Sequence, residues 1–150
     1  MNIFINKLFD RLTGVNTVSF YILSFTWGLP VSLAGLLVFT VLVIFGKKPC
    51  RYGCCVYISI GRRWGGCNYG WFCLTGKNCL NVLPHELGHG LQNIILGPLT
   101  VPLIGLPSSI RYHTRKILAK RGKKLRPYDS IWFESLATAL GKEYALKHQI

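Results

Sequence analysis

The chain has 150 residues, which is one domain's worth of chain and enough for a modest core and one anchor. Half of the residues are hydrophobic and the mean hydropathy is positive, which favours contact with a membrane. The formal net charge of +13 reflects 18 basic and only five acidic residues, so a carboxylate near a candidate site needs an explanation. The five are Asp10, Glu86, Asp129, Glu134 and Glu143.

Residues 1–17 predict a short, weakly basic arm, and residues 18–46 predict a transmembrane anchor. The run from Val18 to Phe45 holds 28 residues without a charge. A bilayer core needs about 20 helical residues, so this run is long enough to span it. A cleavable signal peptide has an apolar core of about 7–15 residues that ends at small residues. This run ends instead at Lys47 and Lys48, which favours a retained anchor.

The basic residues around this segment predict its orientation. Lys47, Lys48 and Arg51 follow the segment directly, whereas only Lys7 and Arg11 precede it. Positive residues are retained on the cytoplasmic side of a membrane. The sequence therefore predicts a single-pass membrane protein whose main domain, residues 47–150, lies in the cytoplasm.

Two segments that follow the anchor, residues 54–61 and 68–75, are rich in β-branched and aromatic side chains. The Gly-rich stretch between them predicts that they form a β-hairpin. An edge strand in such a sheet can pair with an extended peptide through main-chain hydrogen bonds. An ordinary small sheet that covers the helix is the alternative. In both cases the fold class is α+β.

Six cysteines lie in this part of the chain, at positions 50, 54, 55, 67, 73 and 79. Disulfides would fit an extracytoplasmic domain, whereas a cytoplasmic domain keeps its thiols reduced. No C-x-x-C pair occurs, which argues against a thiolate zinc site. We expect most of these cysteines to be small buried hydrophobic residues.

The stretch from Leu83 to Gln92 contains an H-E-x-x-H pattern at His85, Glu86 and His89. Residues four apart on a helix differ by only about 40° around its axis, so both imidazoles can reach one ion. Glu86 can contact a water on that ion but points too far round to be a ligand. Two neutral nitrogen ligands, an open position and a nearby base are what a hydrolytic zinc site requires. The alternative is a surface helix with two unrelated histidines.

The residues around the motif predict where its helix begins and ends. Asn81 is the expected N-terminal cap, Pro84 fits the first turn, and Gly97 marks the end. Gly88 lies inside the helix, where glycine costs about 1 kcal/mol relative to alanine. We therefore expect another backbone to pass close to Gly88.

The segment Leu96–Ser109 is apolar, but its prolines and glycines are incompatible with a regular spanning helix. Arg111–Arg126 then holds eight basic residues and no acidic one. Near a membrane anchor, this pattern predicts a basic amphipathic helix that contacts anionic lipid headgroups. A nucleic-acid surface is less favoured, because no aromatic residues suitable for stacking bases alternate with the basic ones.

A last helix is expected over Ser130–Lys147, capped by Asp129, and it supplies the favoured third metal ligand. Catalytic zinc sites usually have three protein ligands. Glu134 is favoured because it projects from a side of small residues, which would let this helix approach the motif helix closely. The candidates for the third ligand are Glu134, His113, His148 and Asp129.

The string H-E-L-G-H, followed downstream by E-x-x-A at residues 134–137, resembles the gluzincin zinc metallopeptidases. It is most similar to the membrane-bound prenyl-protein and heat-shock membrane proteases, and also to small bacterial and phage membrane proteins with H-E-x-x-H. The resemblance implies a minimal zincin-like domain in which His85, His89 and Glu134 hold Zn²⁺ and Glu86 is the general base. These enzymes usually read E-x-x-A-D, with the Asp orienting a ligand histidine. Thr138 stands at that position here and carries no charge.

These features predict a membrane-anchored metallopeptidase that hydrolyses peptides or proteins near the membrane surface through a zinc-activated water. The alternative is a non-catalytic cationic membrane protein that binds anionic lipid or a protein partner and has a structural or vestigial metal site. Peptide hydrolysis also needs a hydrogen-bond donor to the oxyanion. The sequence leaves four candidates for this donor, and it leaves the oligomeric state open. The candidates are Tyr128, Tyr112, His113 and Arg111.

Overall fold

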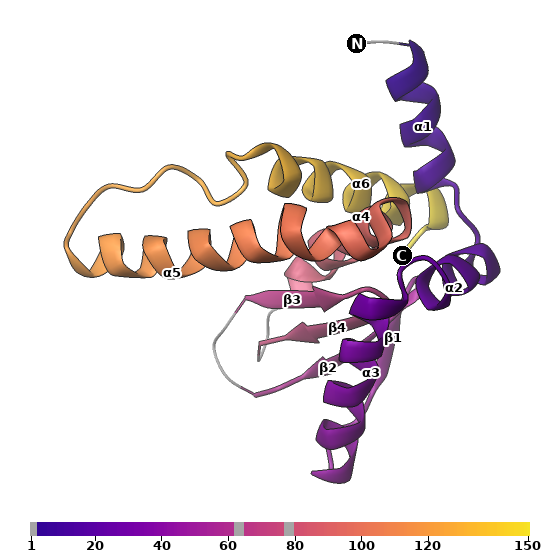
Figure 1. Cartoon of the computed structure of the whole chain (residues 1–150), viewed down its shortest axis with the longest axis horizontal. Coiled ribbons are helices and arrows are strands. Elements are labelled where there is room, and N and C mark those ends of the chain that lie inside the picture. Colours follow the sequence, from indigo (N-terminus) through magenta and orange to yellow (C-terminus); the bar gives the residue numbers. More distant parts are fainter. Residues whose placement is uncertain (1–2, 62–64, 77–79) are drawn as a thin grey trace.

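The computed structural model describes residues 3–61, 65–76 and 80–150 (Figure 1). Within these residues the chain forms α-helices around a four-stranded mixed sheet, which confirms the predicted α+β class. The helices in chain order are α1 (Ile3–Thr13), α2 (Thr17–Phe25), α3 (Leu29–Ile44), α4 (Leu83–Leu96), α5 (Leu106–Lys120) and α6 (Trp132–His148). The strands are β1 (Cys50–Tyr52), β2 (Cys55–Ser59), β3 (Gly66–Tyr69) and β4 (Phe72–Thr75). Three short helical segments are η1 (Leu80–Val82), η2 (Gly97–Leu99) and the π-helix η3 (Val101–Gly105).

The apolar segment 18–46 does not form the single continuous helix that we predicted. It forms α2 and α3, which meet at an angle of 96°. Pro30 lies in the first turn of α3, and because proline has no N–H it cannot continue the helix before it. The Trp27 indole also donates a hydrogen bond of 3.0 Å to the Ile95 carbonyl, which ties the bend to the end of α4.

Among the described residues, no single helix has the length and apolarity that crossing a membrane requires. Two bent pairs reach that length and composition together, α2 with α3 and residues 80–99 with 101–120. The second pair shows that the apolar segment after the motif is helical but irregular, since 3-10 and π turns separate α4 from α5.

One side of α3 packs on the sheet. Its buried residues recur about every four positions, as expected for a single stripe on a helix. The Phe39 and Phe72 rings lie 4.7 Å apart, and a side chain at Gly35 would overlap with Tyr69 and Phe72. The helix predicted as an anchor therefore also covers one face of the sheet. The buried stripe consists of Val31, Ser32, Gly35 and Phe39.

The predicted hairpin between residues 54–61 and 68–75 is wrong. β2 and β4 lie side by side but run parallel, and the strand order is β1-β2-β4-β3. The second segment contains a hairpin of its own, in which β3 and β4 pair across Gly70 and Trp71. Gly70 has φ +66°, the conformation that the first position of a tight II′ turn requires. This turn residue was read as part of a strand.

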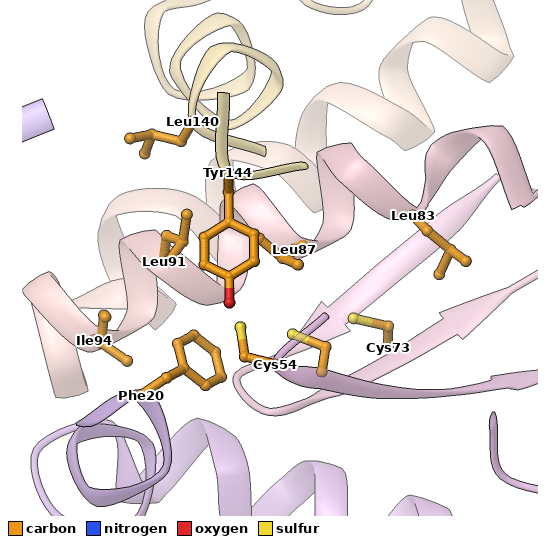
Figure 2. Close-up of a cluster of buried hydrophobic side chains, with 10 residues drawn as sticks. Phe20, Cys54, Cys73, Leu83, Leu87, Leu91, Ile94, Leu140 and Tyr144 are labelled. Atoms are coloured by element: carbon orange, nitrogen blue, oxygen red, sulfur yellow. The ribbon is translucent and has the colours of Figure 1, made fainter. Parts of the chain in front are cut away.

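The main core lies between the sheet, α4 and α6. Tyr144 of α6 points toward Cys54 and Phe20, beside the leucines of α4 (Figure 2). Cys54, Cys55 and Cys73 are buried as predicted, whereas Cys50 is exposed and Cys67 is half-buried. Cys79 lies outside the described residues.

The predicted helix caps are partly wrong. The side chains of Asn81 and Asp129 do not cap α4 and α6, because the residues at the cap positions are Val82 and Ile131. Gly97 does end α4, with φ +54° and its N–H bonded to the Asn93 carbonyl. The ends of these helices are therefore set more by packing than by side-chain caps.

The closest packing in the fold joins α4 and α6. A methyl group at Gly88 would overlap with the Ala137 carbonyl, and one at Gly141 would overlap with the Pro84 carbonyl. The backbone that was predicted to pass near Gly88 is therefore that of α6. Only residues without a side chain at these two positions let the helices meet at this distance.

Replacing Gly88 by alanine is expected to lower the free energy of unfolding by about 1–3 kcal/mol, because the new methyl group forces the two helices apart. This expected decrease is the net change, after the gain of about 1 kcal/mol that alanine contributes through its higher helix propensity. Urea denaturation measures the change. Gly105→Ala is the control, since its methyl group would meet nothing closer than the Thr100 carbonyl oxygen at 3.8 Å. Equal stability of both variants would contradict the prediction.

Candidate metal centre

Helices α4 and α6 bring together the three predicted ligands. The Nε2 atoms of His85 and His89 lie 3.1 and 3.2 Å from the same Oε2 atom of Glu134. In a tetrahedral zinc site with bonds of about 2.0 Å, neighbouring donor atoms are roughly 3.3 Å apart. These two distances are compatible with one ion, and all three donor atoms lie within 4.8 Å of one another, so the group could hold a metal.

The other candidate ligands lie outside this group. His148 stacks on Tyr144 with a centroid distance of 3.9 Å and lies 3.3 Å from the Thr13 carbonyl. His113 and Asp129 are exposed on α5 and on the segment before α6. Of the four candidates, only Glu134 therefore joins the two motif histidines.

Thr138 orients His85. Its hydroxyl donates to the Glu134 carbonyl at 3.0 Å, as a threonine inside a helix commonly does. Because a hydroxyl has only one proton, its contact of 2.9 Å with Nδ1 of His85 must be one in which it accepts. The proton on Nδ1 leaves the Nε2 lone pair directed at the site, so this threonine performs the orienting role expected of an Asp, without the charge.

Gln92 orients the second histidine. Its Nε2 donates to the Phe133 carbonyl at 2.8 Å, which leaves its Oε1 to accept from Nδ1 of His89 at 2.8 Å. The Nε2 lone pair of His89 is therefore also free for a metal. We did not predict this role for Gln92, although its position three residues after His89 was a signal for it.

The second carboxylate oxygen of Glu134, Oε1, accepts a hydrogen bond from a serine. Ser108, in the first turn of α5, donates to Oε1 at 2.6 Å, and its hydroxyl lies 2.9 Å from that of Tyr128. Since Ser108 uses its proton on Glu134, Tyr128 donates to Ser108. The role of Ser108 was not predicted, because nothing in the local pattern connects it to a residue 26 positions away.

Burial alone would raise the pKa of Glu134, whose side chain is fully buried. Hydrogen bonds from the Nε2 atoms of His85 and His89, when these are protonated, and from Ser108 outweigh this effect and hold the pKa well below its ordinary value. A bound cation would take the place of the two Nε2 protons. Glu134 is therefore an ionised carboxylate, the form that binds a cation.

Of the four candidate donors to an oxyanion, only Tyr128 is linked to the site. Arg111 instead donates to the carbonyls of Pro127 and Tyr128, at 3.0 Å each, and so fixes the segment that carries Tyr128. Tyr112 and His113 are exposed on α5 and pack edge-on against each other.

Glu86 lies next to the candidate ligand His85 in the chain and against the face of β3. A side chain at Gly66, the first residue of β3, would overlap with the Glu86 carboxylate. Among the described strands, β3 pairs with β4 alone and has one free edge. Burial raises the pKa of Glu86 to about 8, a shift that the positive charge of His85 opposes and the negative charge of Glu134 increases. A carboxyl with such a pKa can accept and return a proton near neutral pH.

Comparison with known proteins finds no matching family model, no matching curated protein and no matching solved structure. The function of this chain must therefore be inferred from the residues of the site. The site combines two oriented imidazoles, one ionised carboxylate and one buried carboxyl that lies against the face of an edge strand.

Replacing Thr138 by valine is expected to weaken zinc binding by about 10- to 100-fold, because His85 loses the acceptor that fixes its tautomer. Thr138→Ser keeps the hydroxyl and should bind zinc nearly as tightly as the unaltered chain. Competition with a chromophoric chelator measures both affinities. An unchanged affinity in the valine variant would show that Thr138 does not orient the ligand.

Proposed function

We propose that this chain is a zinc-dependent metallopeptidase of the gluzincin type, with zinc held by His85, His89 and Glu134. The observation that carries the proposal is the meeting of three oriented donor atoms at one point, with a buried carboxyl next to them. Two imidazoles and one carboxylate are a known ligand set of catalytic zinc, which keeps a fourth position open for water or substrate.

Zinc bound by this set supplies Lewis acidity, which acidifies a water molecule and polarises the carbonyl of the substrate. Glu86 takes the proton of the attacking water and passes it to the leaving amine. Thr138 and Gln92 keep the two imidazoles in one tautomer while the charge in the site changes. Of the candidate oxyanion donors, Tyr128 lies nearest to the ligands, and to serve the oxyanion it would have to release the hydrogen bond that it donates to Ser108.

The free edge of β3 supports a peptide as the substrate. An extended peptide can add to such an edge through main-chain hydrogen bonds, which hold many sequences in one register. A side chain at Gly66 would overlap with the Glu86 carboxylate, so the proposed base lies against the face of this edge strand. A peptide paired with β3 would run one strand spacing away from it.

We also propose that α2 and α3 attach the enzyme to a membrane, with residues 47–150 on the cytoplasmic side. The side of α3 away from the sheet carries large apolar residues, and Leu37, Ile44 and Phe45 are 63, 77 and 78% exposed. Apolar groups gathered on one side of a helix mark a contact surface. Lys47 and Lys48 follow directly, where a lipid headgroup region would lie.

Glu86→Gln is expected to keep the metal and to lower peptide hydrolysis by about 10²- to 10⁴-fold, since the amide cannot accept the proton of the water. Zinc content is measured by elemental analysis and hydrolysis with a library of internally quenched peptides. Removing the metal with a chelator should abolish hydrolysis, and added zinc should restore it.

Glu143→Gln is the matched control, because it changes a carboxylate of α6 that pairs with Lys147 away from the site. It should leave zinc content and hydrolysis unchanged. Metal retention without hydrolysis in the unaltered chain would favour the alternative, a non-catalytic cationic membrane protein with a structural metal.

For the attachment, Leu37→Asp combined with Ile44→Asp should release the chain from the membrane fraction. Each charge placed in the bilayer costs about 2.5–3.5 kcal/mol. Leu80→Asp combined with Leu146→Asp is the control, because these residues are equally apolar and exposed but lie on η1 and α6. Sedimentation of membranes after a high-salt wash measures both. Retention of the first double variant would argue against attachment through α3.

A further inference from the structure

One side of α5 is uncovered. In Figure 1 this helix extends past the sheet and past the start of α6. Leu106, Ile110 and Ile117 recur at helical spacing on one side and are 56, 65 and 52% exposed. Within the described chain, no α5 side chain is buried. A short helix without packing is only marginally stable in water, so α5 lacks the burial that stabilises α4 and α6.

The charges beside this apolar stripe indicate what covers it. Lys116 and Lys120 border one side of the stripe, and the surrounding segment 111–126 carries eight basic residues and no acidic one. An apolar stripe bordered by basic residues is typical of a helix that lies in the headgroup region of an anionic bilayer. A nucleic acid would match the charge but would leave Leu106, Ile110 and Ile117 in water.

The opposite side of α5 holds parts of the candidate metal centre. Ser108 donates to Glu134, as described above, and Arg111 donates to the Tyr128 carbonyl. The guanidinium of Arg115 lies 5.6 Å from the centre of the Tyr128 ring. A displacement of α5 would therefore move Ser108 and release Tyr128, the two residues linked to Glu134 through hydrogen bonds.

We propose that α5 docks on an anionic bilayer and that docking steadies the Tyr128–Ser108–Glu134 hydrogen bonds. Burying the stripe supplies the packing that α5 lacks in water, so conformations with Ser108 away from Glu134 become less populated. Docking stands independently of the proposed function, whereas the effect on the metal centre rests on it. Binding to the lipid surface would thereby increase the affinity of the site for its metal.

Hydrogen exchange of the full chain tests docking in the presence of vesicles of phosphatidylcholine alone or mixed with phosphatidylglycerol. Amides of residues 106–121 and 127–131 should exchange more slowly with the anionic vesicles only. Zinc affinity under the same conditions should rise at least about fivefold, the lower range of coupling between two sites.

The test variant changes Lys116, Lys120 and Arg121 to glutamate. Since each basic residue near an anionic surface contributes about fivefold to binding, loss of the three positive charges alone should weaken α5 docking roughly a hundredfold, and the added negative charges weaken it further. The exchange of residues 106–121 should then be the same with both kinds of vesicle. The matched control has the same net charge and changes three residues of α1 and α6. These are Lys7, Arg11 and Lys142, and this variant should behave as the unaltered chain does.

Equal exchange with both kinds of vesicle in the unaltered chain, or protection by a single-stranded oligonucleotide instead of anionic lipid, would overturn the docking. Lipid-dependent exchange without a change in zinc affinity would overturn the coupling and leave the docking intact. A chain that binds no zinc in any condition would refute the proposed function, while the exchange measurement would still decide the docking.

Discussion

The contact between the backbones of α4 and α6 is the constraint on which the site depends. Gly88 and Gly141 let each helix lie against a carbonyl of the other, at Ala137 and Pro84. At this distance a glutamate on α6 reaches two histidines on α4 with a single oxygen atom. A larger residue at either glycine would separate the helices, and the donor atoms would no longer meet at one point.

The same packing explains how a very basic protein keeps two buried carboxyl groups in one place. Glu134 is stabilised as an anion by three donors from α4 and α5, whereas Glu86 lies against Gly66 with its pKa raised by burial. Two carboxyl groups on neighbouring helices thus differ in proton affinity. This difference is the condition for one of them to bind a cation and for the other to transfer protons. Their difference arises from their neighbours, since the side chains are chemically identical.

The sheet connects this site with the apolar exterior. α3 covers one of its faces and turns large apolar side chains outward, while α4 covers the other face and carries the motif. The proposed bilayer contacts of α3 and α5 therefore involve elements that pack directly on the sheet or bond to Glu134. An enzyme built in this way would couple its position at a membrane to the geometry of its metal ligands.

The sequence by itself determined the features that depend on neighbours along one helix. These are the pair of candidate ligands in the H-E-x-x-H motif, the helix that ends at Gly97, and the need for a close backbone at Gly88. Side-chain spacing on a helix repeats with a fixed period, so one segment contains the whole signal. Glu134 was also favoured from the sequence, because the small residues beside it predicted a close helix contact.

Only the tertiary structure decided the parallel pairing of β2 with β4, the bend between α2 and α3, and the roles of Gln92 and Ser108. Strand partners and bends depend on packing between segments far apart in the chain, and no local periodicity reports such packing.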